Sequence, residues 1–248
     1  GEREMAFAFK KVGHEVYDIT TNMLLDDPTI LNEMDILAFV GGFSYSDVLG
    51  SANGWASVLM NDEFILSELN KFRKNNKKYA LGICNGFQLL TLLGWFDDIP
   101  CLYGHKVRIV KNDSKRFESR FVNIKIDKKT NNEFLKYNKN DILGVWSAHG
   151  EGKIVITENG KIVDGSNDLY TKLVDYAPIK YIDDSTNPTT KYPFNPNGSR
   201  GGMASLSSYD NRILGIMPHI ERSFLKSQCP FDMLGNKDNF TPWILMFI

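Results

Sequence analysis

A short apolar strand that runs directly into a cysteine and then into a helix constrains the fold of this chain most. Tyr79–Ile83 is predicted as a buried strand, Cys84 follows it, and Asn85–Leu93 has the composition of a packed helix. Glycines stand two positions before and two positions after the cysteine, at Gly82 and Gly86. Such a turn holds its side chain above the carboxyl edge of a sheet, where ligands bind in α/β folds. The segment predicts an α/β domain with a reactive thiol.

The rest of the first half alternates helix and strand. Residues 2–12 read as an amphipathic helix, His14–Ile19 as a short strand, Met34–Val40 as an apolar strand and residues 54–75 as a mixed helix. This order predicts an open, mostly parallel sheet with helices on both faces. Open sheets usually begin with a strand, whereas this chain begins within a predicted helix. We therefore expect the first strand to lie upstream of residue 1.

Beyond residue 105 the pattern becomes more typical of antiparallel strands. Val107–Val110, Phe121–Ile126 and Lys153–Ile156 alternate or are apolar, and an additional antiparallel β region is expected there. Residues 183–203 are rich in Pro, Asn, Gly, Ser and Thr, which predicts a long loop. Without repeats or a clear linker, residues 1–248 are predicted to form one domain, excised from a larger chain.

Composition excludes several classes of function. The 248 residues carry a net charge of −1, with 42% hydrophobic and 24% charged residues, as in an ordinary globular protein. We expect no nucleic-acid partner and no membrane partner, since there is neither a basic excess nor an apolar run of about 20 residues. Three scattered cysteines suit neither a disulfide framework nor a zinc site. Metal-ligand spacing and a phosphate loop are lacking, so no cofactor is predicted in this domain, and a cytoplasmic location is expected.

A base for the cysteine is predicted near the C-terminal end. Ile213–Met217 reads as an apolar strand that leads into His219 and Glu221. A cysteine nucleophile needs a base to take its proton, and that base needs a third group to orient it. In extended chain the two side chains can face the same side. The alternatives are a surface histidine at this position and a buried structural thiol at Cys84; His149 is the rival base.

Further segments are candidates for binding. Gly41 and Gly42 open the run Gly41–Asp47 at the exit of a strand, where glycines let a backbone N–H approach a ligand; a tight structural turn is the alternative. Ser147–Gly152 and Tyr192–Ser199 are two other polar, glycine-containing stretches.

These motifs together resemble the class I (triad-type) glutamine amidotransferases, and among them the C-terminal glutaminase domain of the large, fused phosphoribosylformylglycinamidine synthases. The resemblance spans nearly the whole chain and rests on the following stretches in order: Gly41–Gly54, Leu81–Gln88, Arg116–Arg120, Ala148–Gly152, Tyr192–Ser199 and Met217–Arg222. It implies a flavodoxin-like fold. Phe87 is closer to the small-subunit form of the family, Ser46 replaces a usual glycine, and Ile220 replaces a usual proline.

The resemblance also implies a mechanism and a site. Cys84 would attack the carboxamide of L-glutamine, His219 would act as general base and acid, and Glu221 would orient His219. Backbone amides of Asn85 and of the turn formed by Gly41, Gly42 and Phe43 would hold the oxyanion. The substrate would be held by Gln88 and by the backbone of Ala148, His149 and Gly150.

The implied product, ammonia, would pass to a synthetase domain upstream in the same enzyme. That domain would use ATP and magnesium to make formylglycinamidine ribonucleotide in de novo purine biosynthesis. A sister amidotransferase that serves another pathway also remains open, as do two functions of other kinds. One is a different hydrolase with a cysteine at such a turn, such as a γ-glutamyl hydrolase or a peptidase, and the other is a non-catalytic docking domain.

Overall fold

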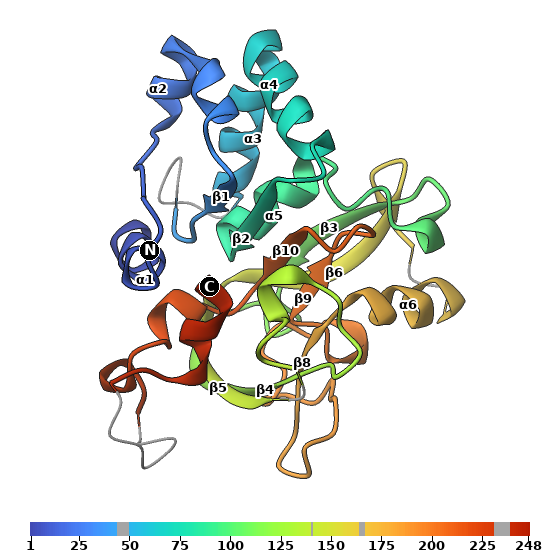
Figure 1. The fold of residues 1–248 in the computed structure, drawn as a ribbon. Coiled ribbons are helices and arrows are strands. Elements are labelled where there is room, and N and C mark those ends of the chain that lie inside the picture. The colour runs from blue at the N-terminus through green and yellow to red at the C-terminus, as the bar shows by residue number, and fades with distance from the viewer. Residues whose placement is uncertain (44–49, 140, 164–166, 231–238) are drawn as a thin grey trace.

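One open sheet of four strands combines two strands from the first third of the chain with two from its last fifth (Figure 1). The computed structural model describes residues 1–43, 50–139, 141–163, 167–230 and 239–248. The strands lie in the order β1-β2-β10-β9, and their bounds are Ile36–Phe39, Tyr79–Ile83, Ile213–Ile216 and Ser205–Ser207. β1, β2 and β10 are parallel, and β9 is antiparallel to β10. β2 and β10 are almost entirely buried, whereas β1 at the edge is half-buried.

Helices flank this sheet. In Figure 1, α3, α4 and α5 lie together beside β1 and β2, whereas α1 lies apart from them and close to the C-terminus. The α-helices are α1 Glu2–Lys11, α2 Thr21–Asp26, α3 Ser51–Asn61, α4 Glu63–Lys74, α5 Asn85–Leu92 and α6 Asn167–Leu173. Short 3₁₀ helices span Pro28–Asn32, Pro100–Leu102, Glu133–Leu135, Val174–Tyr176, Arg200–Gly202, Ile220–Arg222, Lys226–Gln228 and Pro242–Phe247.

Two antiparallel sheets form the rest of the β structure. One has the order β3-β6-β7, and the other has the order β5-β4-β8. Their strands are β3 Lys106–Lys111, β4 Glu118–Ile126, β5 Ile142–His149, β6 Glu151–Glu158, β7 Lys161–Ile162 and β8 Ile179–Tyr181. The expected antiparallel region is therefore present but larger than predicted, because the parallel part of the described chain holds only β1, β2 and β10.

The sequence located most elements within a few residues, with two errors. The helix expected over residues 54–75 is two helices, because the Asp62 side chain accepts hydrogen bonds from the amides of Phe64 and Ile65 and so begins α4. The strand expected at His14–Ile19 is not formed. Its backbone has no neighbouring strand in the described chain with which to pair. The long loop over residues 183–203 is confirmed apart from the 3₁₀ turn near its end.

The apolar residues of the sheet and its helices form a continuous core. Phe87 on α5 packs over Gly215 of β10, where an added Cβ would lie 1.9 Å from the Phe87 ring. The same ring meets Phe96 edge to face at 5.4 Å. Among the residues described, no helix combines the length and apolarity needed to cross a membrane. The strands of this core end at one edge, where the residues discussed next converge.

Candidate active site

Cys84 lies at the sharp turn between β2 and α5. Its backbone has φ 51° and ψ −107°, a left-handed conformation that a residue with a side chain adopts only under strain. The turn is held from both sides, because the Cys84 amide donates to the Ile216 carbonyl at 2.7 Å and the Cys84 carbonyl accepts from the Gln88 amide at 3.0 Å. The thiol thus lies at the carboxyl edge of the sheet, with the N-terminus of α5 directly behind it.

The two glycines around this turn are required by packing. A Cβ at Gly86 would lie 1.9 Å from the Phe39 carbonyl oxygen, so α5 can approach β1 only without a side chain there. A Cβ at Gly82 would lie 2.6 Å from the Leu90 side chain and 2.9 Å from the Gly86 backbone. The glycine spacing seen in the sequence therefore has a physical cause in the close packing of α5 against β1 and β2.

His219 and Glu221 follow the end of β10. His219 Nδ1 lies 2.6 Å from Glu221 Oε1, and both side chains are buried. The reason given from the sequence was wrong, since the chain is not extended here: His219 precedes the 3₁₀ turn Ile220–Arg222, and that turn brings Glu221 back to the ring. The His219 amide donates to the Trp146 carbonyl at 2.7 Å, which ties this segment to β5.

The imidazole of His219 lies next to the Cys84 side chain. Gly41, which follows β1, packs against both side chains. A Cβ at Gly41 would lie 2.7 Å from His219 Cε1 and 3.2 Å from Cys84 Cβ. With Nδ1 bonded to Glu221, the remaining ring nitrogen is available to the thiol, and the sulfur also lies 3.8 Å from the Ala148 carbonyl oxygen. Nucleophile, base and orienting carboxylate thus come from the ends of β2 and β10.

The two histidines of this region have pKa values shifted in opposite directions. Burial alone would lower the pKa of His219, but the negative charges of Glu221 and Cys84 outweigh burial and raise it to about 10. Burial, with the positive charge of His219 adding to it, lowers the pKa of His149 to about 3. His219 is therefore charged at neutral pH, whereas His149 stays neutral.

Both ring nitrogens of His149 are engaged by neighbouring side chains, so His149 is not available as a base. Its Nε2 lies 2.8 Å from Ser147 Oγ and its Nδ1 lies 3.2 Å from Asn112 Oδ1. Asn112 is itself buried, and its side-chain and main-chain amides hold the carbonyls of His149 and Gly150 at 2.8 and 3.0 Å. Sequence reasoning missed Asn112, because a single asparagine outside a motif gives no signal.

A pocket of about 180 Å³ opens over Cys84 and His219. The binding residues predicted from the sequence at this edge line it, with the exception of Gly41, which packs beneath it: Gly42, Phe43, Asn85, Gln88, Ala148, His149 and Gly150. Gln88 is fixed by donating from Nε2 to the Glu151 carbonyl at 2.7 Å. Residues 44–47 of the run that begins at Gly41, including Ser46, lie outside the described residues.

Several pocket residues were not singled out from the sequence. They are Gly50, Ser51, Phe117, Glu151 and Arg222. Glu151 Oε2 accepts from the Gly50 amide at 2.8 Å, and Arg222 is 40% exposed with its Nε 3.9 Å from Glu221 Oε1. A signal did exist for all five, since each of them lies in a stretch that carried the family resemblance. The pocket therefore offers both a cation and a carboxylate near the thiol.

The loop Tyr192–Ser199 contributes no residue to this pocket. Its buried side chains stabilise the loop itself: Asn195 Nδ2 donates to the carbonyls of Thr189 and Ser199 at 3.0 and 2.9 Å. Ser199 Oγ accepts from the Ile154 amide of β6 at 2.9 Å. Within the described residues, no cluster of three or more His, Cys, Asp or Glu side chains is arranged to hold a metal ion.

Comparison with known proteins gives one consistent family. Residues 1–248 match the CobB/CobQ-like glutamine amidotransferase domain. The chain is 43% identical over 254 residues to phosphoribosylformylglycinamidine synthase of Dictyostelium discoideum and 39% identical over 268 residues to that of Homo sapiens. Each alignment covers 100% of this chain but only 18% and 19% of the relative, so the chain spans about a fifth of the relatives it matches.

Solved structures of similar fold agree with this result. PurLQS from Thermotoga maritima superposes with a TM-score of 0.64 at 22% identity, covering 99% of this chain and 89% of that chain. The glutaminase domain of Trypanosoma brucei CTPS, solved with bound acivicin, superposes with a TM-score of 0.53 at 15% identity, covering 98% of this chain and 83% of that one. At these identities the likeness concerns the fold alone.

Proposed function

Since the chain belongs to the CobB/CobQ-like glutamine amidotransferase family, we propose that it hydrolyses L-glutamine to glutamate and ammonia through a thioester on Cys84. The observation that carries the proposal is the convergence of Cys84, His219 and Glu221 beneath one pocket, at a strained turn. Nothing in the arrangement favours a second function. A docking domain has no need of a buried, charged imidazole beside a thiol.

The proposed reaction proceeds in two halves. The Cys84 thiolate attacks the carboxamide carbon, so that a carbon–sulfur bond forms and the carbonyl oxygen becomes an oxyanion. His219 gives its proton to the departing nitrogen, the carbon–nitrogen bond breaks, and ammonia leaves. His219, now neutral, takes a proton from water as the water attacks the thioester, and the carbon–sulfur bond breaks to release glutamate and the thiolate.

The pocket supports each demand of this reaction. Asn85, at the N-terminus of α5, and the turn of Gly41, Gly42 and Phe43 are proposed to offer backbone amides to the oxyanion. Arg222 and Glu151 provide the charges of opposite sign that the carboxylate and ammonium groups of an amino acid require. Glu221 holds the His219 ring in one orientation through the bond to Nδ1.

We propose further that the ammonia serves a synthetase portion of a longer protein. The longer relatives are named phosphoribosylformylglycinamidine synthases, and this chain aligns with only 18% and 19% of their length. ATP and magnesium are expected in the synthetase portion and not in residues 1–248. We propose that this synthetase portion gives the longer protein its role in de novo purine biosynthesis.

A glutaminase assay tests the proposal. Cys84→Ala removes the nucleophile, and we expect the release of glutamate from glutamine to fall by about 10⁴-fold or more, as in other enzymes deprived of their nucleophile. Cys229→Ser, which changes a half-buried thiol outside the pocket, is the matched control and should keep the native rate. Undiminished hydrolysis in Cys84→Ala would end the proposal, provided that circular dichroism shows both variants folded.

A further inference from the structure

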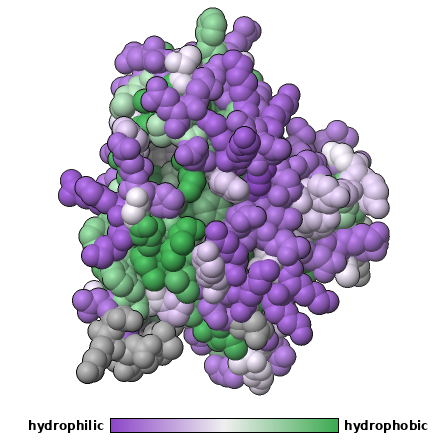
Figure 2. Space-filling view, in the orientation of Figure 1, coloured by the Kyte–Doolittle hydropathy of each residue, from purple (hydrophilic) through white to green (hydrophobic). Residues whose placement is uncertain are grey.

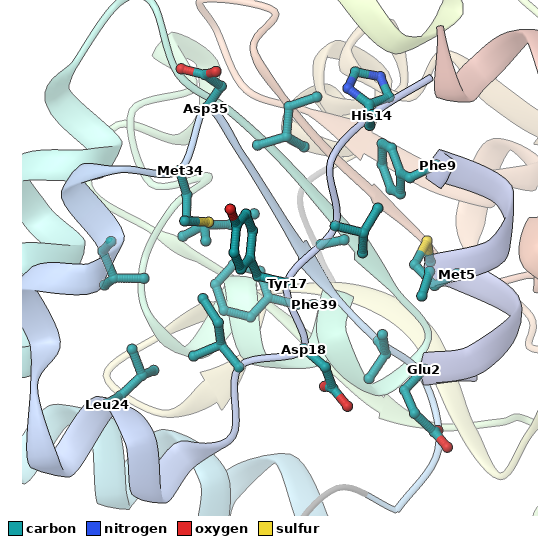
Figure 3. Close-up of a pocket in the computed structure, with 18 of the residues that line it drawn as sticks. Glu2, Met5, Phe9, His14, Tyr17, Asp18, Leu24, Met34, Asp35 and Phe39 are labelled. Carbon is teal, nitrogen blue, oxygen red and sulfur yellow. The ribbon is translucent and has the colours of Figure 1, made fainter. Parts of the chain in front are cut away.

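A groove of about 500 Å³ lies on the side of the molecule that carries α1 and β1, where apolar residues line a hollow (Figure 2). Figure 3 shows Met5 and Phe9 of α1 and Phe39 of β1 among the residues that line it. This groove shares no lining residue with the pocket over Cys84. The affinity for glutamine therefore depends on the smaller pocket and on the residues that hold its walls in place.

One wall of the smaller pocket is the turn from β5 to β6, residues 148–151. On the side of the nucleophile, the carbonyl oxygen of Ala148 lies 3.8 Å from Cys84 Sγ. The carbonyl of Glu151 accepts from Gln88 Nε2 at 2.7 Å, which ties the turn to α5. A shift of this turn would therefore move the wall that faces the substrate.

Asn112, directly after β3, holds the same turn from outside the pocket. It is 1% exposed, and its Nδ2 donates to the carbonyls of His149 at 2.8 Å and Arg116 at 3.0 Å. Its main-chain amide donates to the Gly150 carbonyl at 3.0 Å. Because both side-chain amide hydrogens are used, Oδ1 accepts from His149 Nδ1 at 3.2 Å, and Nε2 is left to accept from the Ser147 hydroxyl at 2.8 Å. Asn112 thus fixes the main chain, the ring orientation and the tautomer of His149.

The polar loop that contributes no residue to the pocket supports Asn112. The carbonyl of Asn197 accepts from the amide of Asp113, the residue after Asn112, at 3.2 Å. Gly198, with φ 82°, packs so closely on Asp113 that an added Cβ would lie 2.1 Å from Asp113 Oδ2. The end of β3 is therefore held in place by residues 195–199.

This part of the loop is itself firmly held. Asn195 Oδ1 accepts from the amides of Asn197 and Gly198 at 3.3 and 2.9 Å, and Asn197 Oδ1 accepts from the Ser199 amide at 2.9 Å. Ser199 Oγ accepts from the Ile154 amide of β6 at 2.9 Å. The loop thus contacts both the end of β3, which carries Asn112, and the strand that follows the turn.

We infer that Asn112, supported by residues 195–199, is a positioning residue that sets the affinity of the pocket for glutamine. The inference rests on the proposed function. Asn112 touches no substrate and acts through the main chain of His149 and Gly150. Because glutamine rests against this wall both before and during the reaction, a displaced wall weakens ground-state and transition-state binding alike. Loss of Asn112 therefore raises KM and leaves kcat nearly unchanged.

Asn112→Asp in the full-length protein tests this role. Aspartate keeps the shape and Oδ1 but loses both donors, so we expect the KM for glutamine to rise by about 10-fold or more. Asn132→Asp is the matched control, since Asn132 is fully buried and its Nδ2 donates to Ser207 Oγ at 2.9 Å and the Ile213 carbonyl at 3.1 Å. It loses the same two donors away from the turn, so its melting temperature should fall while its KM stays native.

The dissociation constant of glutamine, measured by calorimetry on the same variants in Cys84→Ala protein, gives this comparison without turnover. Native affinity in folded Asn112→Asp, or a lowered kcat at native KM, would overturn the inference. An equal rise of KM in Asn132→Asp would also overturn it, because a general loosening of the fold would then explain the effect. Native protein that neither binds nor hydrolyses glutamine would refute the proposed function, and the inference with it.

Gly198→Ala tests the support from the loop. The added Cβ meets Asp113 Oδ2, so we expect the KM for glutamine to rise by about 5-fold or more. Gly160→Ala is the control, because Gly160 has a similar backbone conformation, with φ 77°, and an added Cβ there meets nothing within 4 Å. Native KM in a folded Gly198→Ala variant would contradict the role of residues 195–199.

Discussion

At the scale of single residues, the site combines features that the sequence could and could not reveal. Cys84 was predictable because the strand, the two glycines and the helix around it each leave a pattern. His219 and Glu221 were predictable as a pair, but their geometry was not, since a 3₁₀ turn leaves no clear signal in three residues. Asn112 lies in no motif. Its role is apparent only in the folded structure, where it follows β3 and bonds to the carbonyls of His149 and Gly150 at the end of β5.

The charge of Glu221 has a consequence for the pH dependence of the enzyme. Burial opposes the protonation of His219, and the Glu221 carboxylate is the largest of the influences that raise its pKa, to about 10. The imidazolium that gives its proton to the leaving group therefore persists until the pH approaches 10. The raised pKa also stabilises the fold at low and neutral pH, a contribution that is lost as the pH rises through about 10.

Glu221→Gln should move the alkaline limit of the reaction. Glutamine keeps the shape and a hydrogen-bonding oxygen but loses the charge, so we expect the alkaline limb of kcat/KM for glutamine hydrolysis to shift to lower pH. The rate should fall by about 100-fold or more, since removing the orienting carboxylate of a serine triad costs about 10⁴. Glu63→Gln, on the exposed start of α4, is the control. A pH profile of kcat/KM that superposes on the native one would contradict the role given to Glu221.

At the scale of elements, the sequence was informative where a segment determines its own structure. β2, α5 and the strands at 107–110, 121–126 and 153–156 were all predicted close to their observed bounds. Segment 14–19 shows the limit of such reasoning. Alternating polar and apolar residues favour an extended backbone, but a strand forms only where a neighbouring strand can pair with it. The pairing of the antiparallel strands into two sheets was likewise out of reach, since register depends on contacts between distant segments.

The contact between α5 and β1 positions the nucleophile, and Gly86 is its tightest point. Gly86→Ala would place a Cβ 1.9 Å from the Phe39 carbonyl oxygen and 2.5 Å from its carbon, so the helix must move away from the strand. We expect a loss of about 1–3 kcal/mol in the free energy of unfolding, measured by urea titration with circular dichroism. Asn70→Ala on the exposed side of α4 should stay within about 0.5 kcal/mol of the native value. Equal stability of the Gly86→Ala variant would show that the packing at this turn is not required.

At the scale of the whole molecule, the fold places the reacting residues where three parts meet. The parallel sheet supplies Cys84 and His219, the antiparallel sheets supply Ala148 and Glu151, and α1 begins beside Glu221. The relatives that this chain matches are about five times longer than the chain itself.

The three cysteines provide an internal comparison for the central claim. None of them is paired in a disulfide, so all three are thiols in the same molecule. Burial raises the pKa of Cys101 and of Cys229 and keeps them protonated at neutral pH, and neither lies beside a charged histidine. Cys84 alone of the three lines the pocket with His219.

The most direct measurement is peptide mapping by mass spectrometry after treatment with a chloroketone analogue of glutamine at neutral pH. We predict one covalent label, on Cys84, which forms more slowly in the presence of glutamine and in a His219→Ala variant, while Cys101 and Cys229 stay unmodified. A label distributed among the three thiols, or an unlabelled Cys84 in protein that still hydrolyses glutamine, would contradict the assignment of Cys84 as the nucleophile.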